Sequence, residues 1–264
     1  MSITAKQKIK DLLGRAAEVA GLLQRDFRSK MVIVTFHRVN DWMEEDGITC
    51  SSAKFESFCE FFRRHFRVVR LSEQIAGSRE GRFMGGTLSI TFDDGYRDNF
   101  EVAAPILRRL GLPAAFFVAT GFIGTDYAPP WDEHLRPQPG WMDWDQMRAL
   151  RDQDFEIGAH TDLHIDLGAL DPNAIRSELA RCRAKLKEEL GAPPTLFAYP
   201  FGGEENISPA SLDLVREAGF TCCLGAFGGV NSPDADPFHL NRINVGGWFA
   251  TPRQLGLEIL LRRA

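Results

Sequence analysis

The stretch Leu88-Ser-Ile-Thr-Phe-Asp-Asp-Gly-Tyr96 is an apolar run that ends in two adjacent carboxylates and a glycine. Only small hydroxyl side chains separate its large apolar residues, so no position in 88–92 requires solvent. Runs of this kind are typical of strands buried on both faces, which belong to parallel sheets covered by helices. The stretch therefore predicts a central strand at 88–93 with polar groups at its carboxyl end.

Seven further short apolar runs alternate with helical patterns along the chain. The predicted strands are 32–37, 67–71, 114–120, 155–160, 195–200, 221–226 and 243–245, and the predicted helices are 53–65, 96–110, 144–152, 172–190 and 209–218. Alternating strands and helices favour a mainly parallel sheet. So many strands within 264 residues favour closure into a (β/α) barrel, which typically needs about 250 residues. We therefore expect an α/β protein with one barrel domain at 31–264.

Residues 1–30 carry a different pattern. The apolar positions that recur there at helical spacing are Ile9, Leu12, Leu13, Ala16, Ala20 and Leu23. Charged residues interrupt the segment, so we expect neither a signal peptide nor a membrane span. An amphipathic helix remains, and two interpretations stay open: packing on the domain, or peripheral contact with a membrane or a protein.

The composition is that of an ordinary globular protein, with 44% hydrophobic and 25% charged residues. A formal net charge of −5 gives no overall basic field, so we expect no nucleic-acid partner. The five cysteines are odd in number and include no Cys-x-x-Cys pair, which favours reduced thiols. We expect a cytoplasmic protein, or one at the inner face of a membrane.

Polar residues gather after three of the predicted strands. Asp93 and Asp94 lie at the end of the predicted strand 88–93, and His160 and His164 lie at the end of 155–160. Pro200, followed by two glycines, ends the strand 195–200. A helical turn after His160 would place both imidazoles on one face. One carboxylate and two histidines can bind zinc with positions left open. The second carboxylate could then deprotonate a water, which is a hydrolase arrangement, although the same ligands suit a non-haem iron oxygenase.

These three sites resemble motifs of the polysaccharide deacetylases of carbohydrate esterase family four. The matching segments are Thr91-Phe-Asp-Asp-Gly-Tyr96, His160-Thr-x-x-His164 and Phe197-Ala-Tyr-Pro-Phe-Gly202, within weaker similarity from Val34 to Ile243. The resemblance implies a distorted (β/α) barrel of about seven strands. It also implies metal-dependent removal of an N-acetyl group from an amino sugar in a polysaccharide, an oligosaccharide or a glycan precursor.

The resemblance assigns roles to individual residues. Asp93 matches the catalytic base and the Phe201 N–H matches the oxyanion donor. The residues that match the metal ligands are Asp94, His160 and His164. Zinc is the expected metal, with cobalt or nickel as alternatives.

The general acid departs from the usual pattern, because no Leu-x-His occurs late in the chain. A subgroup similar to poly-N-acetylglucosamine deacetylases has its acid histidine near the start, which favours His37 over His239. The arginine that usually precedes the proline of the third motif is also absent, and Arg242 is the candidate to hold Asp93 ionised in its place.

Aromatic side chains near the predicted loop 121–140 are candidates for contact with sugar rings. We expect Trp131 or Trp141 to form such a platform, Trp144 to pack in the core, and Tyr199 to lie near the substrate. Loops after strands build the active site in barrels, so the 121–140 loop is expected to touch substrate. A non-catalytic sugar-binding protein of the same fold stays open as the alternative to an enzyme.

Overall fold

The sheet is built around β1 (Met31–Phe36) and β5 (Thr87–Phe92), in which every residue is buried. The structure is a computed structural model that describes residues 4–263. The two strands pair in parallel over their whole length, from Met31 opposite Thr87 to Phe36 opposite Phe92. The predicted central strand is therefore confirmed, and its carboxyl end delivers Asp93 to the edge where the other strands also end.

The sheet closes on itself. The strand order is β7-β6-β5-β1-β10-β8, and the other members are β6 (Ala115–Val118), β7 (Glu156–Ala159), β8 (Leu224–Gly228) and β10 (Leu240–Asn244). Parallel bridges from Ala159 to Phe197 and from Ala198 to Leu224 join the two outer strands. The six strands and this bridging segment make seven parallel positions, so the (β/α) barrel is confirmed. It is distorted because the segment at 195–200 forms single bridges instead of the predicted strand.

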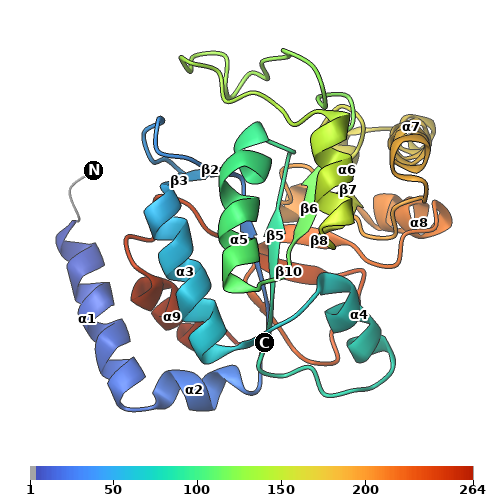
Figure 1. Cartoon of the computed structure of the whole chain (residues 1–264). Coiled ribbons are helices and arrows are strands. Elements are labelled where there is room, and N and C mark those ends of the chain that lie inside the picture. Colours follow the sequence, from blue (N-terminus) through green and yellow to red (C-terminus); the bar gives the residue numbers. More distant parts are fainter. Residues whose placement is uncertain (1–3, 264) are drawn as a thin grey trace.

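Helices surround the barrel (Figure 1). They are α1 (Ala5–Val19), α2 (Leu22–Phe27), α3 (Ser52–His65), α4 (Leu71–Arg79), α5 (Ala104–Leu110), α6 (Trp144–Asp152), α7 (Pro172–Leu190), α8 (Pro209–Glu217) and α9 (Pro252–Leu261). A π-helical turn, Asn99–Ala103, precedes α5, and short 3₁₀ turns lie at Leu167–Ala169 and Glu204–Asn206. Within residues 4–263 no helix is long and apolar enough to cross a membrane.

Stacked phenylalanines fill the space between α3 and the sheet. The Phe92 ring lies 4.8 Å from that of Phe116 and 5.6 Å from that of Phe55, and all three are buried. Aromatic pairs at such distances add to the free energy gained by removing apolar area from water. The last residue of β5 is therefore fixed by packing, and so is the start of the polar segment that follows it.

Several elements differ from the sequence-based expectations. The strand predicted at 67–71 is only β4 (Arg67–Val68), because α4 begins at Leu71. The sequence analysis did not predict several other elements. These are α4, α9, β9 (Val230–Asn231) and the small sheet of β2 (Arg38–Val39) and β3 (Thr49–Cys50). The helix predicted at 96–110 begins at 99, since Gly95 has a φ of 92° and turns the chain first.

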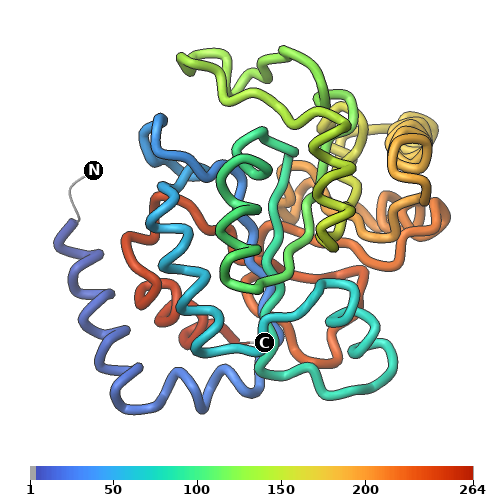
Figure 2. Tube along the Cα trace, viewed as in Figure 1, coloured from blue at the N-terminus to red at the C-terminus, as the bar shows by residue number. Residues whose placement is uncertain are grey.

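The loop 121–140 arches over one end of the barrel, as the Cα trace shows at the top of Figure 2. A buried ion pair between Asp132 in this loop and Arg38 in β2 holds it there. The Tyr96 hydroxyl donates to the second Asp132 oxygen at 2.7 Å, and Arg38 also donates to Asp46 at 2.7 Å. The loop is thus fixed to the body by charged groups that water does not reach.

Loss of Arg38 should be costly, because it leaves the Asp132 carboxylate buried without its charged partner. We expect Arg38→Met to lower the free energy of unfolding by about 3–5 kcal/mol, measured by urea denaturation. Adding Asp132→Asn, which removes the unpaired charge and keeps an acceptor for Tyr96, should restore part of that loss. The exposed pair of Arg67 with Glu73 is the control, and Arg67→Met should cost at most about 1 kcal/mol. Equal losses for the two arginine variants would contradict the buried pair's role.

Candidate active site

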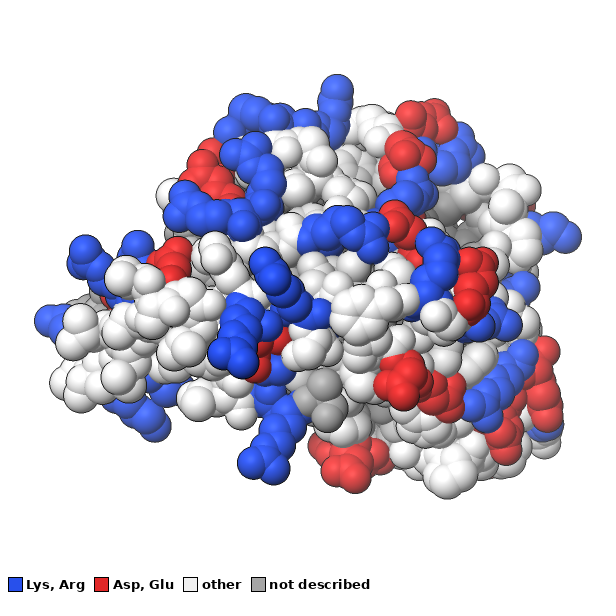
Figure 3. Space-filling model, turned by 90° about the horizontal axis from the view of Figure 1, so that it is seen from below, with Lys and Arg blue, Asp and Glu red and all other residues white. Residues whose placement is uncertain are grey.

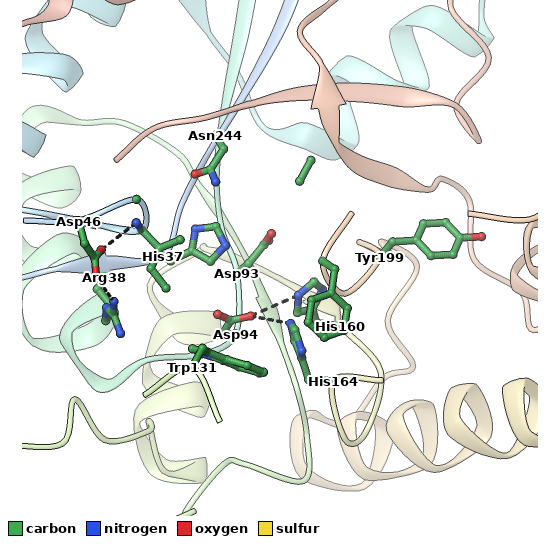
Figure 4. A pocket seen from close by; sticks show the side chains of 14 residues that line it. His37, Arg38, Asp46, Asp93, Asp94, Trp131, His160, His164, Tyr199 and Asn244 are labelled. Atoms are coloured by element: carbon green, nitrogen blue, oxygen red, sulfur yellow. Dashed lines mark hydrogen bonds and ion pairs between the residues drawn. The ribbon is translucent and has the colours of Figure 1, made fainter. Parts of the chain in front are cut away.

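Three side chains meet at the carboxyl ends of β5 and β7. The Asp94 Oδ1 atom lies 3.3 Å from His160 Nε2 and 3.2 Å from His164 Nε2. All three residues are buried, and one ligand atom from each falls within 4.8 Å of the others. The structure therefore brings together the carboxylate and both histidines that the sequence singled out (Figure 4).

The chain reaches this arrangement without the helical turn predicted after His160. Thr161 and His164 instead have positive φ values of 63° and 52°, and the segment between them is not helical. The buried Asp162 holds the turn by accepting hydrogen bonds from Thr120 Oγ1 at 2.6 Å and Lys185 Nζ at 2.8 Å. Both imidazoles face Asp94 because of this turn, so they meet without the helical turn that the sequence analysis considered.

The surroundings of His160 fix which nitrogen faces the site. Its Nδ1 atom lies 2.8 Å from the Ala198 carbonyl oxygen, which can only accept a hydrogen bond. Nδ1 therefore carries a proton, and Nε2 is the ring nitrogen that faces Asp94. A backbone acceptor behind the ring is the usual way in which proteins orient a metal-binding histidine.

The donor set fits a divalent cation. Burial opposes ionisation of Asp94, but His160 and His164 outweigh it and hold the pKa of the carboxyl well below its usual value. No residue in 4–263 donates a conventional hydrogen bond to the buried Asp94 Oδ1 atom. A cation between the three ligand atoms would satisfy this oxygen, and one carboxylate with two imidazoles leaves positions for water and substrate. This is a potential Asp-His-His metal site.

Asp93 faces away from the metal ligands and pairs with Arg242. Two N–H groups of Arg242 donate to the two Asp93 oxygens at 2.8 Å and 2.7 Å, and both side chains are buried. Burial opposes ionisation, but Arg242 and His160 outweigh it, so the pKa of Asp93 lies below its usual value. The structure therefore places Arg242 where the sequence analysis expected it, against an ionised Asp93.

Asp93, Asp94 and the two histidines line a cleft with a volume of about 410 Å³. His37, which follows β1, lines this cleft as well. Its imidazole lies beside Asp93 in Figure 4, and its buried Nδ1 atom has no hydrogen-bond partner among the described residues. Burial lowers the pKa of His37 below its usual value, although the charges of Asp94 and Asp93 oppose this. The carboxylates would stabilise a proton that arrives on the ring.

Phe201 occupies a strained turn at the opposite wall. Its φ is 62°, and the Gly202 N–H donates to the Pro200 carbonyl at 2.6 Å across it, which makes a γ-turn. Within the described chain no group accepts a hydrogen bond from the Phe201 N–H. The residue lines the cleft, and its ring centroid lies 4.7 Å from that of His164. This backbone donor is available to an oxygen atom near the metal ligands.

Three predicted site residues turn their side chains elsewhere. His239 precedes β10, so it lies at the opposite end of that strand from the cleft and pairs with Asp236 on the surface. Tyr199 still lines the cleft, but its ring points away from the other labelled side chains in Figure 4, and its hydroxyl meets Ser211 at 3.3 Å in the core. Trp141 is buried against Tyr96, with ring centroids 4.6 Å apart, and cannot present a face to a sugar. Trp144 packs against the core as expected.

Trp131 is the tryptophan of the loop 121–140 that lines the cleft. Its ring centroid lies 4.8 Å from that of His164, and its Nε1–H donates to Tyr96 at 3.0 Å. The sequence analysis missed Asn244, whose side chain lines the cleft above His37 and Asp93 (Figure 4). Residues two apart in a strand share a face, so the prediction for Arg242 could have led to Asn244.

Comparisons with known proteins agree with this geometry. The polysaccharide deacetylase family profile matches residues 81–223, more than half of the chain. A Bacillus subtilis protein assigned by name to the polysaccharide deacetylases, YxkH, is 28% identical over 156 residues. That match covers 59% of this chain and 50% of the relative, so the chain spans about half the length of that protein.

Two further proteins are similar over most of the chain. The poly-beta-1,6-N-acetyl-D-glucosamine N-deacetylase of Staphylococcus aureus is 23% identical over 210 residues, which is 76% of this chain and 69% of that enzyme. The structure of the Streptococcus pyogenes deacetylase PplD in complex with acetate superposes with a TM-score of 0.73 at 19% identity. It covers 88% of this chain and 98% of that one, which shows a shared fold. The fold, the Asp-His-His site and the extent of the profile match together establish that this chain belongs to the polysaccharide deacetylase family.

Proposed function

We propose that the protein is a metal-dependent hydrolase that removes an N-acetyl group from an amino sugar in a polysaccharide, oligosaccharide or glycan precursor. The observation that carries this proposal is the pairing of adjacent carboxylates. Asp94 faces two histidines while Asp93 is held ionised by Arg242 in the same cleft. Metal binding and proton transfer are thereby divided between neighbouring residues, as hydrolysis of an amide with water requires.

Zinc is the metal we propose, bound by Asp94, His160 and His164, since these ligand types suit it. When bound, it would polarise the amide carbonyl and make a bound water more acidic. Asp93 is the proposed base that takes a proton from that water. Arg242 keeps Asp93 ionised and fixes both of its oxygens, so the carboxylate needs little reorganisation during the reaction.

Two other residues that line the cleft could stabilise the charges that develop on the substrate during hydrolysis. The Phe201 N–H would donate to the oxyanion of the tetrahedral intermediate, because the γ-turn leaves it without an internal acceptor. His37 is the proposed acid that protonates the leaving nitrogen as the C–N bond breaks. Its place in the cleft beside Asp93 supports this role, and the charges of Asp94 and Asp93 oppose the lowering of its pKa by burial.

The substrate proposal rests on the walls of the cleft. The Staphylococcus aureus relative is named for β-1,6-linked N-acetylglucosamine, and we propose a related acetylated amino sugar here. Trp131 offers an aromatic face to a sugar ring. Asn244 offers an amide whose buried Oδ1 has no partner among the described residues, so it can accept from a sugar hydroxyl or the acetamido N–H.

We further propose that the protein works in the cytoplasm, at the inner face of a membrane. Five free, buried thiols are consistent with a reducing compartment. The segment 1–30 would provide the contact with the membrane or with a protein there, and the surface of α1 and α2 supports a membrane.

Asp93→Asn should abolish acetate release while the protein keeps its metal, since the base is lost but all three ligands remain. We expect the turnover rate to fall by about 10²–10⁴-fold, with acetate measured on acetylated glucosamine oligomers and metal by elemental analysis. His164→Ala is the matched variant and should lose both metal and activity. Unchanged acetate release by Asp93→Asn would refute the base assignment, and oxygen consumption in place of acetate release would favour an iron oxygenase.

His37→Ala should reduce the turnover rate by about 10²–10⁴-fold without loss of metal, because a general acid contributes in this range. His239→Ala serves as its control, since that histidine is exposed and outside the cleft. Near-normal activity of His37→Ala, or a large loss in His239→Ala, would remove His37 as the acid.

Asn244→Ala should lower kcat/KM by about tenfold, the worth of one neutral hydrogen bond, mainly through a higher KM. Asn173→Ala, an exposed amide in the first turn of α7, provides the control. A variant that retains the wild-type KM would show that Asn244 makes no contact with the substrate.

A further inference from the structure

On the outer surface of α1 and α2, several large apolar side chains face solvent instead of the core. Amphipathic helices normally turn their large apolar residues toward the core. Here the buried residues of α1 are Gly14 and Ala17, whereas Ile9, Leu12 and Leu13 are 60%, 66% and 53% exposed. Of the large apolar residues noted in the sequence pattern, Leu23 is therefore in the core, while Ile9, Leu12 and Leu13 face solvent.

Small residues explain how α1 is held in this orientation. A Cβ atom at Gly14 would lie 2.4 Å from the Arg253 carbonyl oxygen, so α1 packs directly on the start of α9. The Gln254 side chain donates to the Gln7 carbonyl at 2.5 Å, and Leu23 and Phe27 of α2 are buried beneath. The helix pair is thus docked firmly with its apolar stripe outward.

The apolar stripe continues to the end of the pair. Val19 is 83% exposed and Leu22 is 49% exposed, following Ile9, Leu12 and Leu13 along the same side. At 3.6 residues per turn these α1 positions form one stripe, with Lys8 and Arg15 on one flank and Lys6 on the other. Arg25 and Arg28 extend the exposed cations along α2. We call the exposed side chains of this stripe and its flanks the α1–α2 outer face.

Acidic residues of the same segment are turned inward and paired. Glu18 accepts from Arg253 at 3.0 Å and lies 3.1 Å from His65, and Asp26 pairs with Lys30 at 2.5 Å. Asp11 accepts from Thr251. No exposed carboxylate remains between residues 4 and 28. A protein of net charge −5 therefore presents a local surface on which the fully exposed charged side chains of residues 4–28 are all cationic.

We infer that the α1–α2 outer face binds an anionic lipid bilayer. An apolar stripe between rows of lysine and arginine is the pattern of a helix that lies in the membrane interface. The long cationic side chains can reach lipid headgroups while the stripe enters the acyl boundary. In Figure 3 the left end of the molecule is mostly white surface with blue side chains around it and smaller red patches beside the blue.

The placement of this face keeps the cleft accessible. In Figure 1, α1 runs alongside the barrel, at the left edge, and does not cross the end covered by the loop 121–140. A bilayer against α1 would therefore leave the end of the barrel under the loop 121–140 uncovered. This inference rests on the surface of α1 and α2 and does not depend on the proposed deacetylation.

The test is flotation of the full-length chain with vesicles of phosphatidylcholine alone or mixed with phosphatidylglycerol. We expect binding to the mixed vesicles, weakened by salt. Leu12→Ser with Leu13→Ser should reduce the partition constant by at least about tenfold, because the buried apolar area is lost. Lys8→Gln with Arg15→Gln should reduce it by about fivefold for each cation. Both variants should unfold like the wild type, since these side chains are exposed.

Phe83→Ser is the matched control, because Phe83 is 72% exposed and lies outside the α1–α2 outer face. It should leave vesicle binding unchanged. Failure of the wild type to bind anionic vesicles would overturn the inference, and so would equal binding by the double leucine variant. Sedimentation of the wild type as a dimer that the leucine variant abolishes would assign the face to a second copy of the chain instead. Activity of soluble protein on soluble oligomers tests the proposed function separately.

Discussion

The buried ion pair between Asp93 and Arg242 is the interaction on which the site depends. It links the ends of β5 and β10 across β1, which lies between them in the sheet. Removing two charges from water costs several kcal/mol for each ion, so such a pair survives only where its other donors are satisfied. Arg242 meets this condition by donating also to the Gly225 carbonyl, Thr35 and Thr91. The result is a carboxylate that stays ionised in a region that water hardly reaches.

Backbone strain is concentrated around the potential metal ligands. Five described residues other than glycine have positive φ values, and four of them are Asp94, Thr161, His164 and Phe201. Each such residue costs about 1–3 kcal/mol and keeps this conformation only where the surrounding structure enforces it. At Phe201 the enforcement is close packing, since a Cβ atom on the next residue, Gly202, would lie 2.6 Å from the Ala226 nitrogen. The barrel thus supports a site whose ligand and donor directions are set before any substrate arrives.

Sequence reasoning reached the parts of the site that depend on strand ends. Parallel strands bring their carboxyl ends to one edge, so Asp94 and His160 could be predicted to meet without knowledge of the loops between them. It failed where the choice depended on burial or on strand direction. Trp131 and Trp141 lie in the same irregular stretch, but only the stacking of Trp141 on Tyr96 decides which one reaches the cleft. His239 fell outside because it precedes β10. Helix α4 has no capping side chain at its start, whereas α9 begins with the N-cap Thr251 and Pro252, a signal that the sequence analysis did not use.

The two adjacent carboxylates contact different parts of the chain. Asp94 lies beside two histidines within the family match at 81–223, whereas Asp93 pairs with Arg242, which lies outside that match. Arg242 takes the place of the arginine expected before the third motif, which is possible because a guanidinium needs only the right position and can come from any strand. The neighbouring strands β5, β1 and β10 supply the groups proposed for proton transfer, while β5 and β7 supply the potential metal ligands. Asp94 turns toward the second group because its φ of 75° reverses the chain directly after Asp93. The pair of Asp93 with Arg242 forms only once β10 has docked on β1, so the charge on Asp93, the proposed base, depends on that strand pairing.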